Sequence, residues 1–332
     1  MRRIQIVMGL YRPEPTRLAG QIRSIAAQTA GPITLHACVD GAGALDAPGE
    51  AAIAAGLAGA QVTLALHRFE ENRGVRGNFL RGLAGALEGA GAEDLFAFSD
   101  QDDVWAPEKL ARQVAMLEDP GVALCHHDAR VVDGAGAVLH PSMFAFERRL
   151  TAPDPVDLFF VNSVTGMTML FRRAVAERAV AERAVTGVPA DARLLHDHWV
   201  ALVAAALGRI GLIEAPLADY VQHGANEVGA GQHQTIGWGR AAGRVRATLE
   251  MLRDRRAARL AMFETLERVV GDAPGWPAMR ARIAPLAGPQ PSLRALIGAL
   301  RHARSLPNPA VRESLIRHIA GTAATALLGP PG

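Results

Sequence analysis

Short apolar segments alternate with helical patterns along the first 120 residues, and this alternation constrains the fold more than any other feature. Strands are predicted at residues 4–8, 33–39, 61–66 and 95–98. Leu18, Ile22 and Ile25 recur at helical spacing after the first strand, and further helices are predicted at residues 78–89 and 107–117. Because strands separated by helices pair in parallel, we expect an α/β fold with a mostly parallel sheet flanked by helices.

The composition indicates a globular protein whose charge is unevenly distributed. The chain has 332 residues, of which 49% are hydrophobic, and this is enough for one large domain or two smaller ones. Residues 240–332 hold 15 arginines and 6 acidic residues, whereas the preceding residues hold 20 basic and 27 acidic ones. Because Ala, Gly and Arg are all abundant and Lys109 is the only lysine, the arginines indicate a composition bias, and we expect no nucleic-acid partner.

Three features predict a cytoplasmic protein. Cys38 and Cys125 both lie in apolar, strand-like runs, which predicts buried thiols and a reducing compartment. The apolar run at residues 4–10 is too short for a secretory signal. The longest apolar run, at residues 199–213, is interrupted by a glycine and an arginine and is too short to span a bilayer.

Three carboxylates, those of Asp100, Asp102 and Asp103, crowd the end of the predicted strand at residues 95–98. Carboxylates this close resist ionising together unless a cation neutralises them. Oxygen ligands suit Mg²⁺ or Mn²⁺, which proteins often bind through one or two carboxylates and the oxygens of a bound diphosphate. The alternative is an acidic turn that caps the helix beginning near Pro107. The location at the carboxyl end of a strand favours a ligand site.

Several motifs that are far apart in the sequence have a common explanation. They are Ile6 to Pro13, Val39-Asp40-Gly41, Glu71 to Phe79, Ser99 to Leu110, His196-Asp197-His198-Trp199 and Tyr220 to Asn226. In the order and spacing of these motifs over residues 1–230, the chain resembles the family 2 glycosyltransferases, and within them the bacterial rhamnosyltransferase-type members. The resemblance implies the Rossmann-like GT-A fold at residues 1–235, followed by a basic helical C-terminal region at 236–332.

The resemblance implies donor-binding roles for five residues near predicted strand ends. Tyr11 and Asp40 are expected to hold the nucleobase and ribose of a nucleotide sugar. Asn72, Arg76 and Asn78 lie where a glycine-containing loop enters a helix, a geometry that suits a phosphate. From the residues alone, a surface aromatic at Tyr11 and an ordinary turn at Asp40 are the preferred interpretations. A helix cap at Asn78 is then as well supported as a phosphate site.

Within the acidic run, the resemblance implies that Asp100 and Gln101 face the nucleotide, while Asp102 and Asp103 bind Mn²⁺ or Mg²⁺. The pattern does not decide which carboxylate contacts the ion directly. His223 follows an apolar strand, and similar enzymes use a histidine there on the metal or the diphosphate. An isolated loop histidine is more often a surface residue.

Asp197 is the candidate catalytic base. Displacement of a nucleoside diphosphate from an anomeric carbon in one step needs a carboxylate opposite the leaving group, where it removes the proton of the acceptor hydroxyl. Such a reaction inverts the anomeric configuration without a covalent enzyme intermediate. The alternative is that Asp197 caps the helix that begins near His196. His196 and His198 do not share a helical face, so we do not expect a metal-binding histidine pair.

The predicted function is therefore the inverting, metal-dependent transfer of a sugar from a nucleoside-diphosphate donor to a hydroxyl of a glycan or lipid-linked acceptor in polysaccharide biosynthesis. The donor dTDP-rhamnose is a hypothesis from the resemblance alone. The competing classes are a non-catalytic relative that binds nucleotide sugars or glycans, and a metal-dependent nucleotidyltransferase. The second competitor lacks support, because the sequence contains no Gly-x-x-x-x-Gly-Lys loop.

Two helical segments are predicted outside the motifs. Residues 174–183 repeat the sequence Ala-Val-Ala-Glu-Arg, which predicts a helix on the surface. A longer amphipathic helix carries Leu249, Leu252, Leu260, Phe263 and Leu266. This helix could pack on the protein itself, or the basic C-terminal helices could associate peripherally with an anionic membrane.

Overall fold

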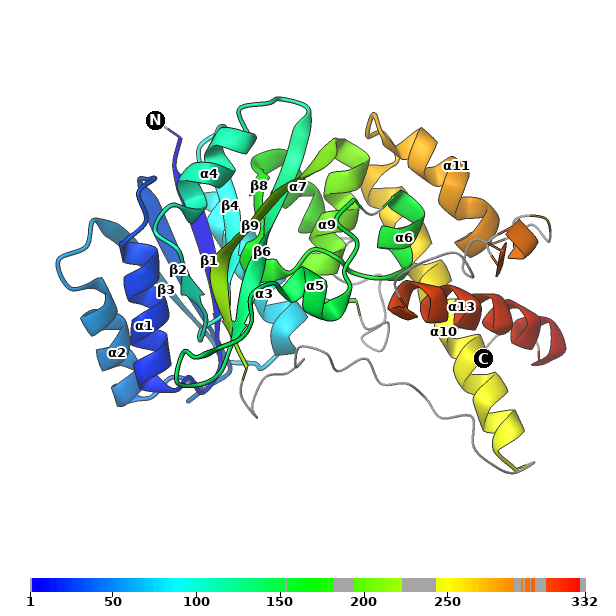
Figure 1. The fold of residues 1–332 in the computed structure, drawn as a ribbon, viewed down its shortest axis with the longest axis horizontal. Coiled ribbons are helices and arrows are strands. Elements are labelled where there is room, and N and C mark those ends of the chain that lie inside the picture. The colour runs from blue at the N-terminus through cyan, green and yellow to red at the C-terminus, as the bar shows by residue number, and fades with distance from the viewer. Residues whose placement is uncertain are drawn as a thin grey trace.

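The computed structural model describes residues 2–152, 154–181, 194–222, 243–289, 294, 296–298, 300–301 and 309–328. Nine strands in this part of the chain form one sheet in the order β3-β2-β1-β4-β8-β6-β9-β5, with β7 paired to β6 (Figure 1). The strands are β1 Ile4–Leu10, β2 Ile33–Asp40, β3 Val62–Phe69, β4 Leu95–Ser99, β5 Val104–Trp105, β6 Val122–Val132, β7 Val138–His140, β8 Leu170–Arg172 and β9 Arg209–Val221. The long strands pair in parallel, and the antiparallel pairs all involve the short β5, β7 or β8.

Helices cover both faces of this sheet, which confirms the expected α/β fold. They are α1 Pro15–Ala26, α2 Ala47–Leu57, α3 Gly74–Glu88, α4 Lys109–Met116, α5 Met143–Glu147, α6 Pro155–Phe160, α7 Arg173–Ala179, α9 His196–Leu207, α10 Gly243–Val270, α11 Trp276–Ala287 and α13 Pro309–Leu328, together with the 3₁₀ turn η1 Gly166–Thr168. Local chemistry explains where many of these begin. At α1, for example, the Glu14 carboxylate accepts hydrogen bonds from the backbone N–H of Thr16 and Arg17, and Pro15 has no N–H to satisfy.

The alternation of side chains along the strands produces two hydrophobic clusters. Ile6 and Met8 of β1 pack with α1 on one face, whereas Val7 faces α3 and the larger cluster on the other. The parallel pairing of β1 with β2 and β4 brings the carboxyl ends of these strands to one edge of the sheet. Asp40 ends β2, and Asp100 directly follows β4, so the predicted donor residues meet at this edge.

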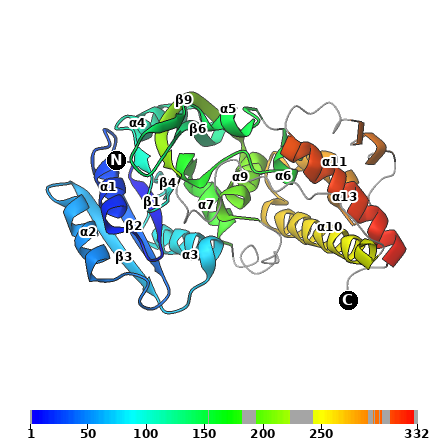
Figure 2. The same ribbon diagram turned by 60° about the horizontal axis from the view of Figure 1, so that its bottom comes forward.

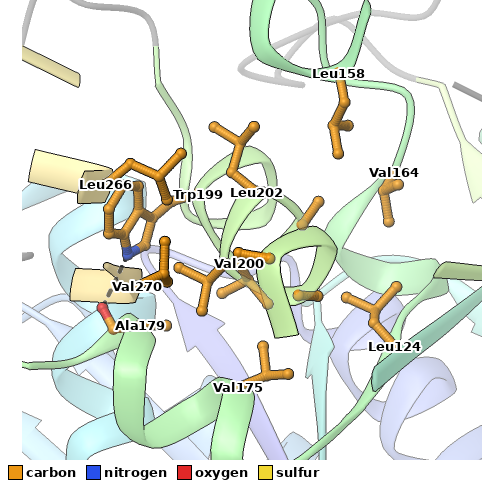
Figure 3. Packing of buried hydrophobic residues seen from close by; sticks show 14 of the residues in the cluster. Leu124, Leu158, Val164, Val175, Ala179, Trp199, Val200, Leu202, Leu266 and Val270 are labelled. Carbon is orange, nitrogen blue, oxygen red and sulfur yellow. Dashed lines mark hydrogen bonds between the residues drawn. The ribbon is translucent and has the colours of Figure 1, made fainter. Parts of the chain in front are cut away.

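The helix α9 lies between the sheet and the C-terminal helices in both views (Figures 1 and 2). Trp199, Val200 and Leu202 of α9 belong to the same cluster as Leu266 and Val270 of α10 (Figure 3). The Trp199 Nε1–H donates to the Ala179 carbonyl at 3.0 Å, which ties α9 to α7. The helix that carries Asp197 is therefore packed on several sides.

The C-terminal amphipathic helix packs on the protein. Leu252, Phe263 and Leu266 of α10 are all buried, and α10 contacts α13, α11 and α9. Its apolar face is thus accounted for by packing inside the molecule. Within the described residues, no helix combines the length and the apolar content needed to cross a bilayer.

Three details differ from the sequence prediction. The apolar runs at residues 122–125 and 129–132 predict two separate strands, but residues 122–132 form one continuous strand with register shifts against β9. The helix expected to begin at Asn78 begins at Gly74. The first copy of the repeat at residues 174–183 lies in α7, where Val175, Ala176 and Ala179 are buried in the core and not on the surface.

Candidate active site

The loop after β1 is joined to the acidic turn, residues 100–103, by one side chain. The backbone N–H of Tyr11 donates to Gln101 Oε1 at 3.0 Å, and Gln101 Nε2 donates to the Tyr11 carbonyl at 3.2 Å. The Tyr11 ring itself is 47% exposed. Gln101 therefore fixes the turn against the loop, and Tyr11 is left as an accessible aromatic ring at the strand edge.

Asp40 lies at the same edge but is buried and engaged. Its carboxylate accepts a hydrogen bond from the Arg73 backbone N–H at 2.9 Å and forms an ion pair with Arg81. The Arg81 guanidinium also stacks on the Phe69 ring, with 3.7 Å between Cζ and the ring centroid. Arg81 is a member of this site that the sequence reasoning missed, because it lies mid-helix outside the motifs.

The three predicted residues at the start of α3 have different surroundings. Asn72 is exposed and accepts from the Gly74 N–H at 3.0 Å. Arg76 is half-buried and donates to the Leu194 carbonyl at 3.4 Å. Asn78 is buried inside α3, where its Nδ2 donates to the Cys38 carbonyl at 2.8 Å. Asn78 is therefore not a helix cap but ties α3 to β2.

The acidic turn does not cap the following helix. Glu108 occupies the N-cap position of α4, and no side chain caps its N-terminus. Asp103 is 1% exposed, whereas Asp100 and Asp102 are half-buried. The Asp103 Oδ1 accepts a long 3.4 Å hydrogen bond from the Val221 N–H, and its Oδ2 has no partner.

Burial and like charge both disfavour the ionised form of Asp103. Desolvation raises the pKa of its carboxyl group well above the ordinary value, and the neighbouring carboxylates of Asp100 and Asp102 raise this pKa further. Lys109 lies below the turn, with its Nζ 3.6 Å from the Trp105 ring centroid and 3.0 Å from Gln113 Oε1. Burial lowers the pKa of Lys109 to about 7, so this amine compensates the acidic turn only in part.

The described residues fit a divalent cation that is held partly by its substrate. The partnerless Asp103 Oδ2 beside two further carboxylates is the kind of site that a cation relieves. Within the described part of the chain, no three His, Cys, Asp or Glu side chains form a complete ligand set. Mg²⁺ typically takes only one or two carboxylates and completes its shell with phosphate and water oxygens. The third predicted ligand, His223, lies outside the described residues.

Asp197 lies in the first turn of α9 and is only 7% exposed. Its Oδ1 accepts from the His198 N–H at 2.7 Å, and its Oδ2 accepts from the Gly166 N–H at 3.2 Å. Leu195, not Asp197, is the N-cap residue of α9. Burial raises the pKa of Asp197, while these two backbone hydrogen bonds, the Arg149 charge and the Asn162 side chain oppose the rise.

The two histidines beside Asp197 are core residues. His196 stacks on Phe79, with ring centroids 3.9 Å apart, and His198 Nε2 bonds to the Leu158 carbonyl at 2.6 Å. Burial lowers the pKa of each to about 3, so both are neutral near pH 7. They point to different elements, as expected for residues that do not share a helical face.

An ion pair that the sequence did not reveal lies at the end of α5. Arg149 Nε donates to Glu147 Oε2 at 2.6 Å. The Arg149 charge acts on Asp197, and the Glu147 charge acts on Tyr220, which also interacts with Asp103. The acidic turn and the candidate base are therefore parts of one electrostatically connected region.

A separate cavity of about 490 Å³ lies between β6, β9 and the end of α9. It is lined by His126, Thr151, Ala152, Pro155, Leu158, Ala205, Gly208, Arg209, Ile210, Leu212 and Glu214. None of the predicted donor, metal or catalytic residues lines it.

Comparisons with known proteins were made with both the sequence and the fold. Residues 12–179, just over half of the chain, match the family described as Glycosyl transferase family 2, and this match ends before Asp197. An uncharacterized glycosyltransferase of Nostoc sp. is 29% identical over 166 residues, which cover 48% of this chain and 47% of the relative. The match therefore spans about half the length of that curated relative.

The fold is similar to that of solved structures. The crystal structure of S. aureus TarS residues 1–349 in complex with UDP-GlcNAc superposes with a TM-score of 0.50. The superposition covers 99% of this chain and 92% of the TarS chain, at 14% sequence identity. At this identity the likeness concerns the fold, and it extends over the C-terminal helices as well as the sheet.

Proposed function

The chain belongs to glycosyl transferase family 2, and on this premise we propose that it transfers a sugar from a nucleoside-diphosphate donor to a hydroxyl of a glycan or lipid-linked acceptor, with inversion at the anomeric carbon. The observation that carries this proposal is the connection between the acidic turn and Asp197. Lys109 lies over the ring of Trp105, which follows the turn, and donates to Gln113. Gln113 Nε2 donates to the Thr168 carbonyl of η1 at 2.8 Å, and the Gly166 N–H of η1 donates to Asp197.

Nucleotide binding, metal binding and proton removal are assigned to different residues. The exposed Tyr11 ring and the loop at Asn72 receive the nucleotide, and Asp102 and Asp103 would hold Mn²⁺ or Mg²⁺. A divalent cation bound there would neutralise charge on the departing diphosphate. Asp197 removes the proton of the acceptor hydroxyl as the new glycosidic bond forms. Its raised pKa suits this task, because a base works best when its pKa approaches the working pH.

The first experiment identifies the donor. Purified protein with Mn²⁺ is mixed with a panel of UDP-, GDP- and dTDP-linked sugars, including dTDP-rhamnose, and release of the nucleoside diphosphate is followed. We expect slow hydrolysis of one donor, with inverted sugar as the product. Saturable binding without hydrolysis would favour a non-catalytic relative, and release of pyrophosphate from a nucleoside triphosphate would favour a nucleotidyltransferase.

The second experiment tests the base. Asp197→Asn should lower transfer or donor hydrolysis by about 10²- to 10⁴-fold, the usual contribution of a positioned base, and should leave nucleotide affinity nearly unchanged. Asp254→Asn removes an exposed carboxylate from α10 and serves as the matched control. Loss of nucleotide binding in Asp197→Asn would move this residue from the base to the donor site.

A further inference from the structure

Arg149 is held in a defined position by two partners. Its Nε donates to Glu147 Oε2 at 2.6 Å, and its Nη1 donates to Thr165 Oγ1. The two side chains of the ion pair are largely buried, with 17% of Arg149 and 10% of Glu147 exposed. An arginine fixed in this way presents its charge at a constant location.

The same turn that holds Arg149 also holds Asp197. Thr165, which accepts from Arg149, is followed by Gly166, whose N–H donates to Asp197 Oδ2. The Thr165 carbonyl accepts from the Thr168 hydroxyl at 2.7 Å and from the Thr168 N–H at 3.0 Å, which rigidifies the turn. Arg149 and Asp197 are therefore both attached to residues 165–166, and their charges interact.

We propose that Arg149 is a positioning residue that keeps Asp197 ionised, and therefore able to act as a base, in a setting that would otherwise hold it protonated. The inference rests on the proposed function, in which Asp197 takes the acceptor proton. A buried carboxyl group without a nearby positive charge stays protonated up to a higher pH than an exposed one. Less of it is then in the ionised form that can accept a proton. The charge of Arg149 offsets part of the rise in the pKa of Asp197 that burial causes, without forming a salt bridge to Asp197.

Arg149 is a positive charge that acts on Asp197, and two further arginines packed near α9 are directed to other acceptors. Arg76 of α3 donates to the Leu194 carbonyl, and Arg259 of α10 donates to the Phe159 and Phe160 carbonyls. His196 and His198 on the same helix are neutral, because burial lowers the pKa of each to about 3. The turn packed against Asp197 contributes the uncharged Asn162 and the Gly166 N–H. Glu147 partly balances Arg149 and therefore limits its effect.

The functional test is the pH dependence of kcat/KM for the donor identified by the panel. In Arg149→Gln the acid limb should move up by about one pH unit, because an opposite charge nearby shifts a carboxyl pKa by about one to three units. Arg149→Lys should restore part of this shift. Arg148→Gln removes the neighbouring exposed arginine and should leave the limb in place. A purely structural role would lower the rate equally at every pH.

The second test needs no substrate. Burial raises the pKa of Asp197 in the folded protein, so its ionisation lowers stability as pH rises through that pKa, and loss of Arg149 should enlarge this effect. The melting temperature lost in Arg149→Gln should therefore grow between pH 4 and pH 8. In the Asp197→Asn background this growth should disappear, which a double-mutant cycle measures at each pH.

The outcomes separate this inference from the function on which it rests. If Asp197→Asn transferred sugar at the wild-type rate, Asp197 would not be the base, and the role proposed for Arg149 would also be overturned. The role of Arg149 alone would be overturned if Asp197→Asn is inactive but Arg149→Gln leaves the acid limb where it is. Additive changes in melting temperature in the double-mutant cycle would have the same meaning. A shifted limb and a pH-dependent coupling would support both.

Discussion

The acidic turn and the first turn of α9 each contain a buried aspartate whose pKa is raised, but the two carboxylates have opposite neighbours. Asp103 has one long hydrogen bond from Val221 and a partnerless Oδ2, and the neighbouring carboxylates raise its pKa. Asp197 accepts two backbone hydrogen bonds and lies near Arg149. The first carboxylate is compensated only in part, by the buried Lys109 amine, whereas the second has fixed donors and a nearby positive charge.

This difference indicates what each site can do. A cluster of carboxylates whose charge is compensated only in part gains most from a cation supplied from outside, which is the setting of a metal-bound diphosphate. A carboxylate whose charge is already balanced by fixed donors can exchange a proton without a cation. Burial alone would not distinguish the two roles, because both side chains are almost fully removed from water.

The largest effect is expected from Asp103→Asn. It removes a buried charge that two other carboxylates repel, so the melting temperature without metal should rise, while the further rise produced by Mn²⁺ should shrink. Transfer should fall by about 10²-fold or more, since a cation contributes several kcal/mol to stabilising the departing diphosphate. Thermal unfolding with and without Mn²⁺ and the donor assay measure these changes.

Asp254→Asn is the control for this variant, because its carboxylate pairs on the surface with Arg253. If Asp103→Asn instead melted at a lower temperature and kept the full response to Mn²⁺, then Asp103 would serve to hold β9 through Val221. The contrast between the two aspartates would in that case be one of packing and not of charge compensation.

A second, smaller effect is expected from Arg259→Gln. Arg259 of α10 donates to the carbonyls of Phe159 and Phe160 at the end of α6, and the preceding carbonyl, of Leu158, accepts from His198. The C-terminal helices and the first turn of α9 are thus attached to the same end of α6. Loss of the charged donor should lower the free energy of unfolding by about 2 to 3 kcal/mol.

Urea denaturation measures this loss, and Arg253→Gln, whose charge pairs with the adjacent Asp254, is the matched control. Because Arg259 supports α9 from outside the charged region, the rate of transfer should fall at every pH with no movement of the acid limb. A shift of the acid limb would mean that the C-terminal helices change the pKa of Asp197. The contrast between the two aspartates instead assigns that effect to Arg149.

Much of the fold could be predicted from the sequence, since the apolar strands and the turn residues that follow them are strong local signals. The acidic run at the end of β4 was placed correctly, and the helix at Asp197 begins at His196 as expected. The start of α3 was misplaced by four residues, because Arg73 precedes it and no side chain caps it. Helix starts without a capping side chain leave little trace in a sequence.

The parts of the site that the sequence did not reveal come from irregular chain. Glu147, Arg149 and Thr165 lie in a stretch with short helices and no sustained periodicity, so nothing in the pattern marks them as neighbours of Asp197. The repeat in α7 was assigned to the surface, yet Val175, Ala176 and Ala179 are buried. Small residues fit both environments, and only the contact with α9 and α3 decides between them.

The smallest effect concerns the histidine beside the candidate base. A folded-state pKa of about 3 for His196, against 6.5 for the unfolded chain, means that its stabilising contribution is complete above pH 6.5 and is lost as pH falls toward 3. At pH 5 the free energy of unfolding is therefore lower by about 2 kcal/mol than above pH 6.5. His196→Phe keeps a ring against Phe79 and Phe98 and should change stability at pH 7.5 by only about 1 kcal/mol. Urea denaturation at both pH values should therefore show a smaller loss between pH 7.5 and pH 5 in the variant. Equal losses in both proteins would mean that His196 takes up a proton in the folded state, and a positive charge other than Arg149 would then lie beside Asp197.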